Sequence, residues 1–395
     1  MQLKDNTRDR QEPKPRSEVV RATDVPVAGL ADFFRVVWDP QATAETTRQG
    51  LQAAAEANLV SPGETPPTFV FVSEERVLGY VSSIPIRVWN GSAQRAAYWV
   101  KGLMVLPEFR NGPIGFLLLK EAVRHLPCAL ALTVAPAARR LFEALGFSDL
   151  GVVANYIRIL RPSRVLRWLD PRLLGLSGLP RWLPTVANLV QRSGLAWLLG
   201  TCLAGGTGFW IGVRRGWMGD LRVDSQAPVP APGELDALWL RFREKLEGAP
   251  VRDGRYLLER YARRGAGTYQ CVTVRQGSTL VGWAAVRQPA DPGDPRLQGL
   301  RVATLSDLIF PLGETRIGLA ALRGAEAAAR RFEADALLCS ASHTSLLAVL
   351  PRQGYLRIPG NMHLFLRDTT GENTLPGVLS AWYLTRGDGE SDEVF

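Results

Sequence analysis

The stretch from Tyr98 to Phe147 constrains the fold of this chain more than any other. It begins with YWVKGLMVL, whose β-branched and apolar residues predict a strand, and Pro107 ends that strand because proline lacks a backbone N–H. A short loop, EFRNGPIG, comes next, and the segment FLLLKEAVRHL then carries apolar residues at helical spacing. The expected local order is therefore strand, loop and helix.

The loop has the features of an anion-binding site. The N–H groups in the first turn of the following helix have no partner within the helix, and the helix dipole adds about half a positive charge there. Gly112 and Gly115 let the backbone approach a ligand closely, and Arg110 supplies a cation. A bound pyrophosphate suits these features.

The segment VLPEFRNGPIG, Val105 to Gly115, resembles the V-x-P-x-x-R/Q-x-x-G-x-G/A signature of the GNAT acetyltransferases, which cradles the pyrophosphate of coenzyme A. Pro113 departs from the signature, because the family usually has glycine there, and one backbone donor is lost. A second segment, Ala138 to Phe147, is similar to the second GNAT signature, A-x-x-L-Y-x-x-x-G-F. The resemblance implies acetyl-CoA, or another acyl-CoA, as co-substrate. It implies that the cofactor contacts come from Leu103, Met104, Val105, Arg110, Asn111, Gly112, Pro113, Ile114, Gly115 and Phe142.

In this family an amine attacks the thioester directly, so the resemblance implies that backbone N–H groups at Leu103 to Val105 polarise the thioester carbonyl. A tyrosine usually protonates the departing thiolate, but Phe142 stands at that position and is equally explained as a core aromatic. The catalytic residues therefore stay unknown. The candidates are Tyr98 and Lys101, which could line the amine pocket, and Asp307, which could also be a strand-end or capping residue.

The second half of the chain repeats the order of the first. The segment TYQCVTVRQGSTLVGWAAVRQ resembles TFVFVSEERVLGYVSS, and SDLIFP resembles GLMVLP. Similar segments in the same order predict two GNAT-like α/β (mixed α+β) domains, each a mostly antiparallel mixed sheet flanked by helices. The second copy is degenerate, because no R-x-x-G-x-G follows Pro311. The predicted divisions are a disordered tail (1–18), a GNAT domain with the acyl-CoA site (19–160), a basic, Trp-rich apolar linker (161–221), a degenerate GNAT-like domain (222–370) and a C-terminal tail (371–395).

The linker carries nearly all of the excess positive charge. The chain has a net charge of +9, and from Arg158 to Arg215 there are nine arginines and one acid. The run from Ser193 to Val213 is uncharged, but its glycines make it weakly hydrophobic. Three interpretations stay open: helices that pack between the domains, attachment to an anionic membrane surface through residues 161–216, and a membrane span. Nucleic-acid binding is not expected, because these arginines alternate with leucines.

Composition and cysteine usage place the chain among globular cytoplasmic proteins. Its four cysteines lack metal-ligand spacing, its histidines lack partners at such spacing, and the N-terminus resembles no signal peptide, so we expect no metal site and a cytoplasmic location, at most peripheral to the inner face of the membrane. The expected function is acyl-CoA-dependent transfer, of acetyl in the first instance, to a primary amine of a small molecule or an envelope-sugar precursor. The alternative is a non-catalytic or Fem-like binding or scaffold protein, because Ala381 to Asp392 resembles the tail of tandem-GNAT proteins related to Fem-type aminoacyltransferases. The sequence does not indicate the oligomeric state.

Overall fold

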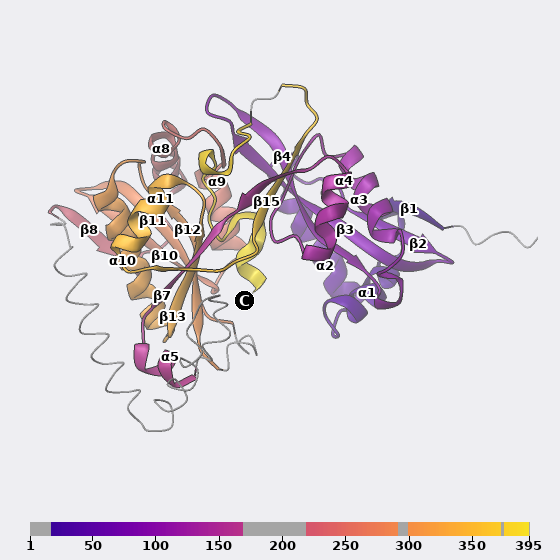
Figure 1. Cartoon of the computed structure of the whole chain (residues 1–395), viewed down its shortest axis with the longest axis horizontal. Helices are drawn as coiled ribbons and strands as arrows, with labels where there is room; N and C mark the ends of the chain where they lie inside the picture. The colour runs from indigo at the N-terminus through magenta and orange to yellow at the C-terminus, as the bar shows by residue number, and fades with distance from the viewer. Residues whose placement is uncertain (1–16, 169–218, 291–298, 373–374, 395) are drawn as a thin grey trace, which may run out of the picture.

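The computed structural model describes residues 17–168, 219–290, 299–372 and 375–394. These residues form two mixed sheets flanked by helices, which confirms the predicted fold class (Figure 1). Most of the segment 161–216, including the uncharged run from Ser193 to Val213, lies outside the described residues. Within the described ranges, no helix is both long enough and apolar enough to cross a membrane.

The first sheet has the strand order β1-β2-β3-β4-β5-β15-β6, with β9 also paired to β3. Its first strand begins at Ser17, within the predicted tail, because the backbone from Ser17 to Arg21 pairs with β2. The strands are β1 (Ser17–Arg21), β2 (Phe69–Ser73), β3 (Arg76–Trp89), β4 (Gln94–Val105), β5 (Cys128–Ala131), β6 (Ser148–Val152), β9 (Ala249–Pro250) and β15 (His363–Asp368). The helical segments of this part are η1 (Ala22–Asp24), α1 (Val27–Val37), α2 (Ala44–Glu56), η2 (Pro107–Phe109), α3 (Ile114–Arg124) and α4 (Pro136–Ala144).

The second sheet has the strand order β14-β7-β13-β12-β11-β10-β8. Its strands are β7 (Ala154–Ile159), β8 (Leu221–Asp224), β10 (Tyr269–Gln276), β11 (Thr279–Arg287), β12 (Val302–Ile309), β13 (Ala336–Ala341) and β14 (Leu356–Ile358). The helical segments of this part are α5 (Pro162–Trp168), α8 (Pro232–Arg243), α9 (Gly254–Leu257), η4 (Leu258–Arg263), α10 (Thr315–Arg331), α11 (Thr344–Arg352), η6 (Leu379–Ala381) and η7 (Asp388–Val394). The hairpin β10–β11 and the unit β12-α10-β13-α11 repeat the order of β2–β3 and β4-α3-β5-α4.

Two strands are exchanged between the sheets. Strand β7 leaves the first sheet and pairs with β13 and β14 of the second, whereas β15 pairs with β5 and β6 of the first. Figure 1 shows the yellow strand β15 running with the purple strands of the first sheet, and the magenta strand β7 among the orange strands of the second. The sheets therefore cross the predicted domain limits at 160 and 222, and those limits stay a prediction.

Alternate residues of β3 face helices on opposite sides of the first sheet. An added Cβ at Gly79 would lie 2.7 Å from Leu118 of α3, whereas the ring of Tyr80 contacts Phe34 of α1 at 5.0 Å between centroids. Successive side chains of a strand point to opposite faces, so α3 covers one face and α1 the other. Residues beyond Tyr80 on the α1 face form the floor of the site described below.

The segment predicted as a C-terminal tail is packed between the two sheets (Figure 1). Trp382, Tyr383 and Leu384 are fully buried, and Trp382 and Leu384 share an apolar cluster with Trp99 of β4 and Leu364 of β15. Burial of large apolar side chains is the main favourable contribution to folding, so this segment is part of the core.

The exchange of β15 predicts that a residue late in the chain stabilises the first core. Phe365 is fully buried in that core, 5.8 Å from the ring of Phe142. We expect Phe365→Ala to lower the free energy of unfolding by about 3–5 kcal/mol, because it removes a buried aromatic ring and leaves a cavity. Urea denaturation followed by circular dichroism measures the change.

The matched control for this experiment is Leu356→Ala on β14. Leu356 is 56% exposed, so its truncation is expected to change the free energy by no more than about 0.5 kcal/mol. Equal stability of the two variants would contradict the placement of β15 in the first sheet.

Candidate functional site

The predicted anion-binding loop joins the end of β4 to the start of α3. Pro107 opens the short helix η2, and α3 begins at Ile114 with Pro113 at its N-cap and no side-chain cap. The N–H groups in the first turn of α3 are therefore available to an external acceptor. The guanidinium of Arg110, in this exposed loop, donates to the carbonyl of Val105 at 3.2 Å. An added Cβ at Gly115 would meet only a methyl group of Val105 at 3.9 Å, so the surface beside Gly115 is open.

Strand β4 continues beyond its pairing with β5. The parallel register joins only Tyr98 to Ala129 and Trp99 to Leu130, whereas the pairing of β4 with β3 reaches Val105. The register with β3 shifts near Gly102, which has φ +66°, a conformation that favours glycine. The backbone from Leu103 to Val105 is thus held by β3 on one side and extends past β5 on the other.

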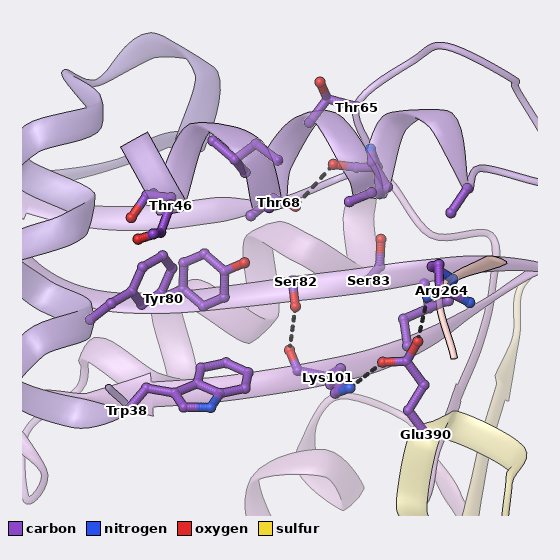
Figure 2. Close-up of a pocket in the computed structure, with 18 of the residues that line it drawn as sticks. Trp38, Thr46, Thr65, Thr68, Tyr80, Ser82, Ser83, Lys101, Arg264 and Glu390 are labelled. Carbon is purple, nitrogen blue, oxygen red and sulfur yellow. Dashed lines mark hydrogen bonds and ion pairs between the residues drawn. The ribbon is translucent and has the colours of Figure 1, made fainter. Parts of the chain in front are cut away.

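A cavity of about 430 Å³ lies over β3 from Tyr80 to Pro85 and beside Lys101 of β4, on the face covered by α1 and α2. Figure 2 shows Trp38 and Tyr80 at one end and Lys101, Arg264 and Glu390 at the other, with Ser82 between them. The lining also includes Phe34, Asp39, Thr46, Thr47, Leu51, Thr65, Thr68, Ser83, Ile84 and Pro85. Arg264 comes from the second part of the chain and Glu390 from its C-terminal segment, so three distant segments build one cavity.

The charged end of the cavity is internally neutralised. Glu390 forms ion pairs with Lys101 and, at 2.7 Å, with Arg264, and Arg260 lies 3.8 Å from the same carboxylate. Burial raises the pKa of Glu390, but these three cations outweigh it and bring the pKa to about 2. Glu390 is consequently a fixed anion at neutral pH and a poor general base.

The corresponding place in the second sheet is filled by the chain itself. Strands β12 and β13 pair from Val302 to Leu305, and beyond that point the C-terminal segment enters: Thr385 bridges to Ala341, and the N–H of Gly387 donates to the carbonyl of Ser306 at 2.6 Å. An added Cβ at Gly387 would lie 2.8 Å from that carbonyl oxygen, so only glycine permits this approach. No comparable space beside β12 is left for a ligand in this part of the structure.

The structure separates the three catalytic candidates. Lys101 lines the cavity and pairs with Glu390. Tyr98 is half-buried on β4 and does not line the cavity; burial, and then the charge of Glu64, raise the pKa of its phenol. Asp307 lies in the second sheet, where its carboxylate accepts from Arg252 at 2.9 Å and from Tyr261 at 3.3 Å. A catalytic role for any of them stays a prediction.

The predicted cofactor residues fall into two places. The segment from Leu103 to Gly115 forms the end of β4, the loop and the start of α3, and within it the side chain of Ile114 is buried in the core. Phe142 is instead buried in the core, 4.9 Å from the ring of Phe147, and a cofactor contact by this ring stays a prediction.

Sequence reasoning missed Trp38, Tyr80, Arg264 and Glu390 as cavity residues. Glu390 is 289 positions from Lys101, so no local spacing connects them. The one available signal was the alternation of acids in the segment GDGESD, whose members bind Arg252, Lys101 and Arg260 in turn.

Comparisons with known proteins agree with this geometry. A family model for the acetyltransferase (GNAT) family matches residues 30–147. No curated protein sequence matches the chain significantly. Solved structures with a similar fold include two described as GCN5-related N-acetyltransferases. The one from Anabaena variabilis has a TM-score of 0.53 and 12% identity, over 90% of this chain and 73% of that one. The one from Kribbella flavida has a TM-score of 0.54 and 11% identity, over 89% and 71%.

A third similar structure is Saccharomyces cerevisiae N-myristoyltransferase with bound myristoyl-CoA and inhibitors. Its TM-score is 0.53 and its identity 12%, over 89% of this chain and 79% of that one. At such identities the likeness shows a shared fold, and it extends over both sheets.

The ion pair at the cavity predicts a pH-dependent contribution of Glu390 to stability. We expect Glu390→Gln to lower the free energy of unfolding by about 1–3 kcal/mol at pH 7, because the neutral amide no longer offsets the charges of Lys101, Arg260 and Arg264. The folded-state pKa of about 2 lies below the ordinary 4.5, so the carboxylate stabilises the fold above pH 4.5 and loses this effect as the pH falls toward 2. The difference between the two proteins should shrink over that range.

Thermal unfolding from pH 7 to pH 3 measures this difference, with Glu143→Gln, an exposed position on α4, as the control. A constant difference between wild type and Glu390→Gln at all pH values would show that the charge of Glu390 does not stabilise the fold.

Proposed function

We propose that this chain, whose residues 30–147 match the model of the acetyltransferase (GNAT) family, transfers an acetyl group from acetyl-CoA to a primary amine of a small molecule or an envelope-sugar precursor. The observation that carries this proposal is that an anion-binding helix start and a cavity lie at the same strand. The uncapped N-terminus of α3 lies at the end of β4, and Lys101 of the same strand lines a cavity large enough for a small acceptor, whose floor is formed by the neighbouring strand β3.

The residues present fit the pyrophosphate of an acyl-CoA. The first-turn N–H groups of α3 and the cation of Arg110 supply donors and positive charge, and the open surface at Gly115 admits close approach. Pro113 contributes no N–H, so the donors come from Ile114, Gly115 and Phe116. The backbone of β4 from Leu103 to Val105 would hold the acyl end, because it extends beyond β5.

Acetyl-CoA supplies an activated acyl group: the amine nitrogen forms the amide bond as the C–S bond breaks, the sulfur leaves as the thiolate and is protonated, and the amine loses one proton to water. The chain's part is to orient the amine toward β4 and to keep it neutral. Well-oriented attack accounts for about 7–11 kcal/mol of a barrier, so a site without a strong base can still be catalytic. Burial of the amine in the cavity favours its neutral form, because desolvation disfavours an ammonium.

The alternative of a non-catalytic or scaffold protein has one supporting observation. The only carboxylates lining the cavity among the described residues are Asp39 and Glu390, and the low pKa of Glu390 makes it a weak proton acceptor. A protein that binds acetyl-CoA without acceptor-dependent release of coenzyme A would match this alternative.

A double variant tests the assignment of the cofactor loop. We expect Arg110→Ala combined with Gly115→Glu to weaken acetyl-CoA binding more than tenfold, because a cation is lost and a carboxylate is placed against the pyrophosphate. The open surface at Gly115 accepts the added side chain, so the fold should persist. Isothermal titration calorimetry measures the affinity.

The control is Arg124→Ala at the opposite end of α3, where the exposed guanidinium of Arg124 pairs with Glu121 of the same helix. Unchanged affinity in the double variant, with a normal melting temperature, would refute the cofactor site.

The pH dependence of turnover tests how the amine loses its proton. If the acceptor arrives neutral, kcat/KM should rise about tenfold per pH unit up to the pKa of the acceptor amine. Two acceptors whose amine pKa values differ should therefore give inflections that differ by the same amount. An inflection that stays at one pH for both acceptors would instead identify a protein group as the base.

A further inference from the structure

One end of the cavity is lined by aromatic side chains that a ligand could contact. The ring of Phe34 lies 5.0 Å from Tyr80 and 6.2 Å from Trp38, both in edge-to-face geometry. Trp38 is 56% exposed although it lines the cavity, so a large apolar surface is available to a ligand there. Aromatic groups prefer such offset or edge-to-face neighbours, and a flat ring would gain contact with Trp38 and Tyr80 together (Figure 2).

The hydroxyl groups in the middle of the cavity already donate to the protein backbone. Ser82 donates to the carbonyl of Lys101 at 3.0 Å, Ser83 to that of Pro67 at 2.8 Å, and Thr68 to that of Pro66 at 3.0 Å. These three hydroxyls can accept hydrogen bonds but have no free proton to give, whereas the hydroxyl of Thr47, which also lines the cavity, is buried without a hydrogen-bond partner. A sugar ring carries several hydroxyl groups, so we expect it to lose more hydrogen bonds to water than this lining replaces.

The charged end of the cavity does not favour an acceptor that carries a second charged group in addition to its reacting amine. Both carboxylate oxygens of Glu390 are bound, one by Lys101 and one by Arg264. A distal ammonium, as in a polyamine, would have to displace one of these cations. A carboxylate would have to compete with Glu390 for them.

The reacting end of the acceptor can be placed relative to the rings. An added Cβ at Gly102 would lie 3.5 Å from Tyr80 and 3.7 Å from Trp38, so the aromatic end lies close to the β4 backbone directly before Leu103, where the segment assigned to the acyl end begins. An amine at this backbone therefore lies within a short alkyl chain of a ring packed on Trp38.

We infer that the preferred acceptor is a primary amine on a short alkyl arm of a flat aromatic body, with the ring against Trp38, Tyr80 and Phe34 and the amine toward Gly102. This inference rests on the proposed function and narrows its acceptor class. It favours arylalkylamines over amino sugars, polyamines and amino acids.

The first test compares acceptors with acetyl-CoA as donor. The full chain is assayed by thiol release with 2-phenylethylamine, tryptamine, glucosamine, putrescine and phenylalanine. We expect kcat/KM for the two arylalkylamines to exceed that of each other amine at least tenfold. Calorimetry with 2-phenylethylamine should also show binding to the protein without acetyl-CoA.

The second test uses variants of α1 and its cap. Trp38→Ala should raise KM for 2-phenylethylamine about tenfold with unchanged acetyl-CoA affinity, and Trp38→Phe should restore most of the loss. Val36→Ala is the control, because Val36 is 58% exposed on α1 and does not line this cavity.

The outcomes separate the two proposals. A preference for glucosamine or putrescine would overturn the inference while the acyltransferase function stands. A preference for octanoyl-CoA over acetyl-CoA that Trp38→Ala removes would also overturn it, because the aromatic end would then hold the acyl chain. If 2-phenylethylamine binds but no amine releases coenzyme A from a protein that binds acetyl-CoA, the proposed function fails while the aromatic site is supported.

Discussion

The first sheet is completed by a strand that arrives from the far end of the chain, and the rest of the structure depends on this exchange. Strand β15 lies between β5 and β6 and provides the hydrogen-bond partners of both. Without it, buried backbone groups on two strands would be left unpaired, which is costly. The exchange of β7 in the other direction ties the second sheet to the first in the same way. Because the chain returns to the first sheet through β15, its final segment can pass between the two sheets and bring Glu390 to the cavity.

Charged pairs then fix the path of that final segment. Asp388 and Asp307 share the buried guanidinium of Arg252, and Asp392 pairs with Arg260 at 2.6 Å. Burial and the nearby charge of Asp307 raise the pKa of Asp388 to about 6, although Arg252 lowers it. Buried ion pairs add little net stability compared with apolar packing, but each allows only one geometry. We therefore infer that these ion pairs fix the position of the C-terminal segment and so bring Glu390 to Lys101.

The two similar sheets use the same location differently. In the first sheet, β4 extends past β5 and leaves a surface beside the uncapped start of α3. In the second sheet, the C-terminal segment fills the space beside β12, and the close approach at Gly387 leaves no room for another occupant. A shared fold thus supports a ligand site in one part of the chain and an internal packing contact in the other, which illustrates why a fold alone does not define a function.

The sequence alone determined the elements whose signals are local. The strand, loop and helix from Tyr98 to Phe147 and their likeness to a GNAT site follow from apolar periodicity and from Pro107, Gly112 and Gly115. The repeat of this order in the second half followed from the same kind of pattern. Only the tertiary structure decided that β7 joins the second sheet and β15 the first, because the alternation of apolar and polar residues along these two strands suits either sheet equally. It also decided the cavity, since Trp38, Lys101 and Glu390 meet through long-range packing that leaves no spacing in the sequence.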